Sequence, residues 1–130
     1  MGKATQAVAS AHVLLELGDV DGACNRAYYA MFDAAQAALL LSGVPATDAL
    51  GKTHRGLINT FSAYLVKDGP VSKELGRQLK RAEEMRLVAD YNGESVTKAD
   101  AAELVDNAKA FVSAMQQLFF ENPAAPSTAA

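Results

Sequence analysis

The sequence of 130 residues contains one cysteine, two histidines and no tryptophan. The single Cys24 forms no disulfide within the chain, and its small apolar neighbours favour a buried thiol. The longest apolar run, residues 34–41, contains a glutamine and is far shorter than the roughly 20 residues that span a bilayer. The first residues lack the apolar core of a secretory signal peptide. We therefore expect a cytoplasmic protein that is not inserted in a membrane.

Neither positive nor negative charge dominates the sequence, since the formal net charge is only −3. This balance argues against a nucleic-acid surface over the whole chain and leaves room for a local basic patch. The sequence also lacks the Glu-x-x-His, Cys-x-x-Cys and glycine-rich patterns that bind di-iron centres, zinc and phosphate. We expect no metal and no cofactor, so any catalysis would depend on Arg, His, Tyr and Asp side chains between helices.

Helical periodicity runs through most of the chain, and no segment alternates as a strand would. Glycine, proline and Asn-Gly pairs separate the periodic segments. The expected helices cover residues 7–17, 21–42, 53–67, 73–90 and 97–120. Ser72 is expected to cap the fourth helix, and Thr97 followed by Asp100 to cap the fifth. The sequence thus predicts an all-α, antiparallel bundle of four to five helices in one domain, residues 1–121, with a disordered tail at 122–130.

The second segment, residues 21–42, is apolar or small almost all round. Such a helix must be covered on more than one face, either by its own domain or also by a second copy of the chain. Asn25, Arg26 and Asp33 lie among these apolar residues. Because buried polar groups cost free energy unless they are paired, these three need a structural or functional partner.

Arg86 is the most unusual residue of the fourth segment, because it projects into the middle of an apolar face. An unpaired guanidinium there would be costly, so we expect a carboxylate nearby, from Asp90 or Glu83. Arg86 is then either half of a structural ion pair or a phosphate ligand in a cleft or an interface. The rest of that face consists of Leu75, Leu79, Ala82 and Ala89.

Two further features each have two interpretations. His54 opens the third segment in line with an apolar face, so it is either a hydrogen-bonded core or cap residue or a catalytic group. A basic stripe on the fourth segment is either a solvated surface or a surface that follows a phosphate backbone. The stripe consists of Lys73, Arg77, Lys80 and Arg81.

Three motifs in this order and spacing resemble the small stand-alone HEPN-domain proteins (higher eukaryote and prokaryote nucleotide-binding). They are Asn-Arg-Ala-Tyr-Tyr-Ala-Met-Phe at residues 25–32, Thr-His-Arg-Gly at 53–56 and Arg-Leu-Val-Ala-Asp-Tyr at 86–91. The resemblance covers about residues 5–120. It implies a helical bundle that forms a homodimer, often encoded beside a minimal nucleotidyltransferase as a toxin–antitoxin pair.

Many HEPN proteins are metal-independent endoribonucleases with an Arg-x4–6-His motif that meets its copy across the dimer. Arg86 matches the motif arginine, whereas Tyr91 stands five residues later where histidine is usual. The resemblance implies that Arg86 stabilises the charged phosphorane and that Tyr91 or His54 transfers or positions a proton. In some of these systems the partner attaches nucleotides to a nearby tyrosine, for which Tyr91 is the nearest candidate. Binding or supporting roles fall on Asn25, Arg26, Tyr29, Asp33 and Asp90.

Three functions are therefore open at this stage. The first is a HEPN endoribonuclease of a toxin–antitoxin or defence-type system, acting as a dimer on RNA with a nucleotidyltransferase partner. The second is a non-catalytic module that binds a nucleotide or a partner, and the third is a purely structural bundle. Arg86 together with Tyr91 favours the first two over the third. Tyr91 in place of histidine shifts the balance from the first towards the second, so enzymatic activity is left open.

Overall fold

The computed structural model describes residues 2–50, 53–92 and 96–120, apart from the side chains of residues 50 and 89–92. These residues form six α-helices and contain no strand, which confirms the all-α prediction. Two π-helical stretches, η1 (Ser62–Val66) and η2 (Gln116–Phe120), continue α4 and α6. The α-helices are α1 (Gly2–Glu16), α2 (Val20–Leu41), α3 (Ala46–Leu50), α4 (His54–Phe61), α5 (Lys73–Asn92) and α6 (Lys98–Met115).

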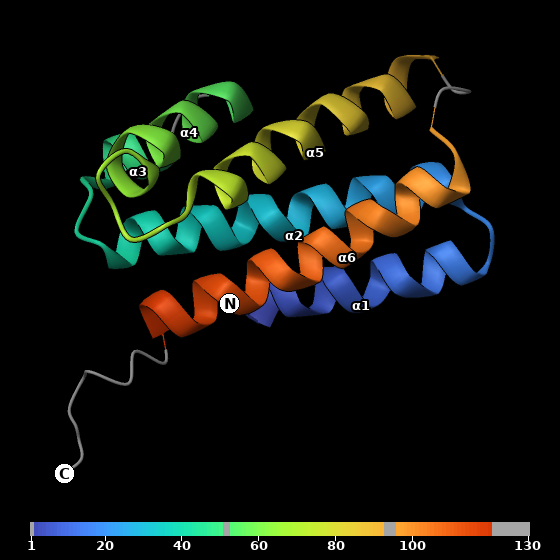
Figure 1. Ribbon diagram of the computed structural model, residues 1–130, viewed down its shortest axis with the longest axis horizontal. Coiled ribbons are helices and arrows are strands. Elements are labelled where there is room, and N and C mark those ends of the chain that lie inside the picture. The colour runs from blue at the N-terminus through green and yellow to red at the C-terminus, as the bar shows by residue number, and fades with distance from the viewer. Residues whose placement is uncertain (1, 51–52, 93–95, 121–130) are drawn as a thin grey trace, which may run out of the picture.

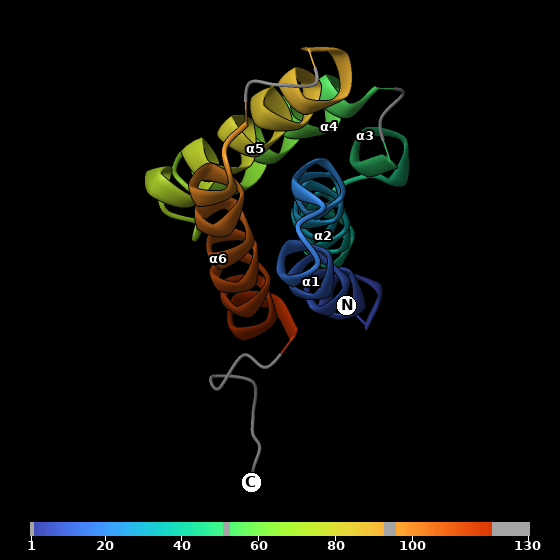
Figure 2. The same cartoon turned by 90° about the vertical axis from the view of Figure 1, so that its right-hand side faces the viewer.

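Helix α2 lies at the centre of the bundle and packs against α1, α4, α5 and α6. Helices α1 and α2 form an antiparallel pair, and α6 runs alongside them in the direction of α2 (Figure 1). Helices α4 and α5 lie on the side of α2 opposite to α1, as the end-on view also shows (Figure 2). The sequence motif at residues 25–32 therefore lies on a helix that has neighbours on more than one side.

The prediction that residues 21–42 are covered on more than one face is confirmed. Tyr28 and Ala30, which point to nearly opposite sides of α2, are both fully buried. The covering helices belong to the same chain, so the composition of α2 is accounted for without a second copy. Alanines let these helices approach α2 closely. The fully buried alanines of α2 are Ala23, Ala27, Ala30, Ala34, Ala35 and Ala38.

The polar residues of α2 lie at its solvent edge rather than inside the bundle. Arg26 is exposed, and Asn25 and Asp33 are half-buried. Water can therefore solvate them, and the internal partners that the sequence pattern suggested are not required.

Side-chain caps fix where the helices begin. The Thr53 hydroxyl accepts a hydrogen bond from the Gly56 amide at 2.8 Å, which makes His54 the first residue of α4. The predicted caps at Ser72 and Thr97 are confirmed, with bonds from the Leu75 and Asp100 amides at 3.2 and 3.0 Å.

The helices differ from the sequence-based prediction by more than two residues in two places. Helix α1 begins at Gly2 instead of residue 7, because buried Ala4 extends its apolar face by one turn. The short helix α3 follows Pro45, where only a break was expected. Proline ends one helix and suits the start of the next, and the Pro45 carbonyl accepts bonds from the Asp48 and Ala49 amides. The predicted tail, residues 122–130, lies outside the described residues.

The buried thiol predicted for Cys24 is confirmed, since Cys24 has no exposed surface. Within the described segments, no helix has both the length and the hydropathy that a membrane crossing would need.

Candidate functional site

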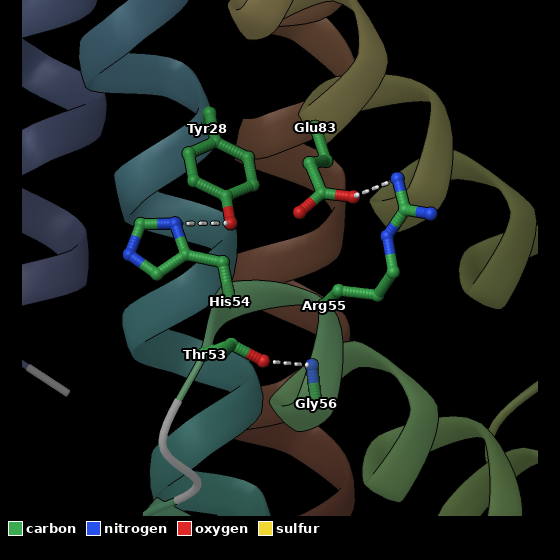
Figure 3. A network of polar contacts seen from close by, with 6 residues as sticks. All are labelled: Tyr28, Thr53, His54, Arg55, Gly56 and Glu83. Atoms are coloured by element: carbon green, nitrogen blue, oxygen red, sulfur yellow. Dashed lines mark hydrogen bonds and ion pairs between the residues drawn. The ribbon is translucent and has the colours of Figure 1, made fainter.

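Residues from α2, α4 and α5 meet beside the first turn of α4. The Tyr28 hydroxyl lies 3.0 Å from Nδ1 of His54, within hydrogen-bond distance. Figure 3 shows the phenol of Tyr28 directed at the imidazole, and Glu83 directed towards the same space from α5. The first two sequence motifs, far apart in the chain, are thus joined by a side-chain hydrogen bond.

The imidazole of His54 packs within a group of aromatic rings on α2. Its centroid lies 4.5 Å from that of Phe32, 5.5 Å from that of Tyr29 and 5.6 Å from that of Tyr28. These contacts hold a half-buried ring whose Nδ1 is engaged with Tyr28. The second nitrogen, Nε2, points away from Tyr28 (Figure 3) and has no hydrogen-bond partner among the described residues. It is therefore the ring nitrogen through which His54 can act on a ligand.

The hydroxyl of Tyr28 is held in its neutral form. Burial raises the pKa of Tyr28, the carboxylate of Glu83 raises it further, and the guanidinium of Arg86 opposes the shift in part. A neutral phenol can donate to Nδ1 or accept from it. When Nδ1–H donates to the Tyr28 oxygen, Nε2 keeps its lone pair and can accept a proton from a ligand. In that tautomer the pair Tyr28–His54 provides the arrangement that a general base requires.

Arg86 lies against the same two tyrosines as His54. Its guanidinium carbon is 4.9 Å from the centroid of the Tyr28 ring and 5.9 Å from that of Tyr29. Cation–π contacts of this kind are worth about 0.5–2 kcal/mol. The side chain of Arg86 is half-buried, and fully buried Leu79 lies two helical turns earlier on the same side of α5. The first residue of the third motif thus joins the first two.

Glu83 supplies a buried carboxylate at this site, with 8 % of its surface exposed. It forms an ion pair with Arg55 of α4, in which Nη2 and Oε1 are 3.9 Å apart. The expected pairing of Arg86 with Asp90 falls outside the described residues, because the side chain of Asp90 is among those not described. The same is true of Tyr91.

The other predicted residues lie at the edge of this site. Tyr29 belongs to the aromatic group, and Arg26 approaches its ring at 5.6 Å. Arg26 also donates a hydrogen bond to the side-chain oxygen of Asn25 at 3.3 Å. Asp33 is farther along α2 and lines a groove between α1 and α2.

From the sequence Tyr28 is only a core residue, and its bond to His54 was missed. One signal was available: a buried tyrosine usually needs a partner for its hydroxyl.

The basic stripe of α5 is exposed and partly neutralised, as its solvated-surface interpretation requires. Nη2 of Arg77 lies 2.7 Å from Oε1 of Glu74, and Nη2 of Arg81 lies 3.6 Å from Oε1 of Glu103. The hydrogen bond and charge of Arg77 lower the pKa of Glu74. Across the described part of the chain, no three His, Cys, Asp or Glu side chains gather into a group that could hold a metal ion.

Comparison with known proteins places this chain in a family. The sequence model of the HEPN domain family matches residues 1–118. The chain is 33 % identical over 114 residues to a UPF0332 protein of Gloeobacter violaceus, covering 86 % of each chain. It is 32 % identical over 118 residues to a UPF0332 protein of Thermotoga maritima, covering 89 % of this chain and 85 % of the relative. The protein therefore belongs to the HEPN domain family.

A third relative carries a functional name. It is the Methanocaldococcus jannaschii protein named "Putative toxin", which is 30 % identical over 118 residues and matches 91 % of this chain and 84 % of its own.

Proposed function

We propose that this protein is a toxin-type HEPN endoribonuclease that cleaves RNA without a metal ion. One observation carries the proposal: the imidazole of His54 and the guanidinium of Arg86 lie around the same two tyrosine rings. A proton acceptor and a fixed positive charge in the same site are the two groups that phosphodiester cleavage by a ribose hydroxyl requires. The toxin name of the archaeal relative supports the same class of function.

In the proposed reaction, the ribose 2′-hydroxyl attacks the adjacent phosphorus while Nε2 of His54 accepts its proton. Arg86 stabilises the negative charge that develops on the phosphorane oxygens. The bond from phosphorus to the 5′-oxygen then breaks, and a proton returns to that oxygen. We assign this donor to Tyr91 from its place in the sequence motif, because a phenol with an ordinary pKa of about 10 is a proton donor at neutral pH. The products are a 2′,3′-cyclic phosphate and a 5′-hydroxyl.

We also propose that the protein forms a homodimer and acts with a minimal nucleotidyltransferase. Both proposals rest on the family, in which paired motifs meet across a dimer, and not on the composition of α2. Light scattering at micromolar concentration should show twice the mass of one chain. A nucleotidyltransferase gene beside this one, whose product co-purifies with the protein, would support the second proposal. A monomer at all accessible concentrations would contradict the first.

A second candidate function is binding without cleavage. It is favoured by Tyr91, which stands where the motif histidine is usual, and by the contacts of His54 with Tyr28, Tyr29 and Phe32. Such a module would bind a nucleotide or RNA through Arg86 and would not cleave the RNA.

Incubation of RNA with the pure protein in EDTA separates the two candidates. The endoribonuclease is expected to cleave RNA and leave 2′,3′-cyclic phosphate ends, and His54→Ala should lower the rate by about 10²–10⁴-fold. His12→Ala, a histidine of α1 away from the site, is the matched control and should keep the rate. Several intact RNA substrates with a folded protein would favour the binding module. Cleavage that needs an added divalent metal would contradict the proposed mechanism.

A further inference from the structure

A groove runs along the surface between α1 and α2, next to the site around His54. Its volume is about 500 Å³, which is within the range of sites for small ligands. The side chains relevant to its chemistry are Lys3 and Ser10 of α1 and Arg26, Tyr29, Phe32 and Asp33 of α2.

The wall of the groove is continuous with the site. Phe32 and Tyr29 line the groove and also pack against the imidazole of His54, at centroid distances of 4.5 and 5.5 Å. Two guanidinium groups approach the ring of Tyr29: Arg26 on the groove side at 5.6 Å, and Arg86 of the site at 5.9 Å. The ring of Tyr29 is therefore shared by the site and the groove.

The groove combines the three kinds of group that bind a nucleotide. Lys3 and Arg26 are exposed cations, suited to a phosphate. Tyr29 and Phe32 are half-buried rings, suited to stacking with a base, which contributes about 1–3 kcal/mol per base in single-stranded complexes. Among the described residues Asp33 is the one acidic residue that lines the groove, and its carboxylate only accepts hydrogen bonds.

We infer that this groove binds a guanine nucleotide of single-stranded RNA, next to the phosphate that is cleaved. The base packs on Phe32 and Tyr29, and its phosphate lies at Arg26 and Lys3. Guanine presents two adjacent donors, N1–H and the N2 amino group, to the carboxylate of Asp33. Adenine places the N1 lone pair at the equivalent position and would be repelled. The inference rests on the proposed function, in that it takes RNA as the ligand, and adds a subsite and a base preference.

Binding of mononucleotides tests the inference without any cleavage. Guanosine and adenosine 5′-monophosphates are titrated into the wild-type protein in EDTA and followed by NMR. We expect guanosine monophosphate to bind about tenfold more tightly, the discrimination typical of a bidentate contact to a base. The chemical-shift changes that guanosine monophosphate causes should be largest at Phe32 and Asp33. Equal affinities, no binding at millimolar concentration, or shifts confined to the Arg77 face of α5 would each overturn the inference.

Two groove variants complete the test. Asp33→Asn should bring the two nucleotides to within about twofold of each other, because the amide replaces one acceptor by a donor. Arg26→Ala should weaken both nucleotides equally, and Arg77→Ala, an exposed arginine on α5, should change neither. A guanine preference that persists in Asp33→Asn would overturn the assignment of the base.

The outcomes separate this inference from the proposed function. If the groove prefers guanine but RNA stays intact, the subsite is supported and the endoribonuclease is contradicted. If RNA is cleaved, and Arg26→Ala and Asp33→Asn cleave the same sequences at the wild-type rate, the subsite is contradicted and the endoribonuclease is supported.

Discussion

The hydroxyl of Tyr28 and Nδ1 of His54, 3.0 Å apart, connect the centre of α2 to the first residue of α4. Tyr28 has no exposed surface and a raised pKa, so its hydroxyl stays protonated at physiological pH. The contact orients the imidazole, and Nε2 keeps its lone pair when Nδ1 is the donor in it. A structural hydrogen bond and the chemistry proposed for His54 therefore depend on the same two atoms.

Replacing the phenol tests this dependence. Tyr28→Phe should lower the free energy of unfolding by about 1 kcal/mol, the usual contribution of one hydrogen bond. It should also change the ratio of the two His54 tautomers, read from the nitrogen chemical shifts of the ring. Tyr64→Phe is the control, because Tyr64 is exposed and its hydroxyl bonds to Asp48 at a longer 3.3 Å. An unchanged tautomer ratio in Tyr28→Phe would mean that the contact does not orient His54.

The buried thiol predicts a loss of stability at alkaline pH. Burial, with the charges of Asp21 and Asp100, raises the pKa of Cys24 from 9.0 to about 11. Between these values the unfolded chain ionises first and binds fewer protons, so the free energy of unfolding falls as pH rises. At about 1.4 kcal/mol per pKa unit, the loss is of the order of 2 kcal/mol.

Urea unfolding at a series of pH values measures this loss. The slope between pH 9 and 11 should be smaller in Cys24→Ala, which has no thiol to ionise. Tyr28 contributes to the remaining slope above its ordinary pKa of 10.0. Identical slopes in the two proteins would contradict the assignment to Cys24.

The ion pair between Arg55 and Glu83 should contribute little to stability. Its atoms are 3.9 Å apart, and 74 % of the Arg55 side chain is exposed, so water screens the attraction. Arg55→Ala should therefore lower the free energy of unfolding by less than about 1 kcal/mol in chemical denaturation. Arg77→Ala, which breaks the exposed pair with Glu74, is the matched control. A loss above about 2 kcal/mol for Arg55→Ala alone would show that the carboxylate of Glu83 depends on Arg55.

Local signals in the sequence predicted most of the fold. Helical periodicity located the long helices, and the Ser72 and Thr97 hydroxyls marked two starts correctly because capping depends on neighbours three residues apart. Helix α3 was missed because Pro45 was interpreted only as a stop. The burial of α2 was expected, but the sequence could not specify that α1, α4, α5 and α6 of the same chain provide it.

The sequence singled out residues of the candidate site but did not predict the contacts between them. His54 and Arg86 were selected because each interrupts an apolar face, which is a local signal. That both lie around Tyr28 and Tyr29 depends on how α4 and α5 pack on α2, which periodicity does not encode. Arg26 was expected among apolar residues but is exposed, because the side of α2 that carries it faces solvent.

The most direct test of the central claim is RNA cleavage in EDTA by Arg86→Ala, measured together with helicity by circular dichroism. Arg77→Ala serves as the control for loss of a positive charge on α5. If Arg86 stabilises the phosphorane, the variant should keep the helicity of the wild type and lose activity by about 10²–10³-fold, as when one oxyanion-stabilising donor is removed. Wild-type cleavage by a folded Arg86→Ala would contradict the account, and so would a variant that fails to fold, because Arg86 would then be a structural residue of the core.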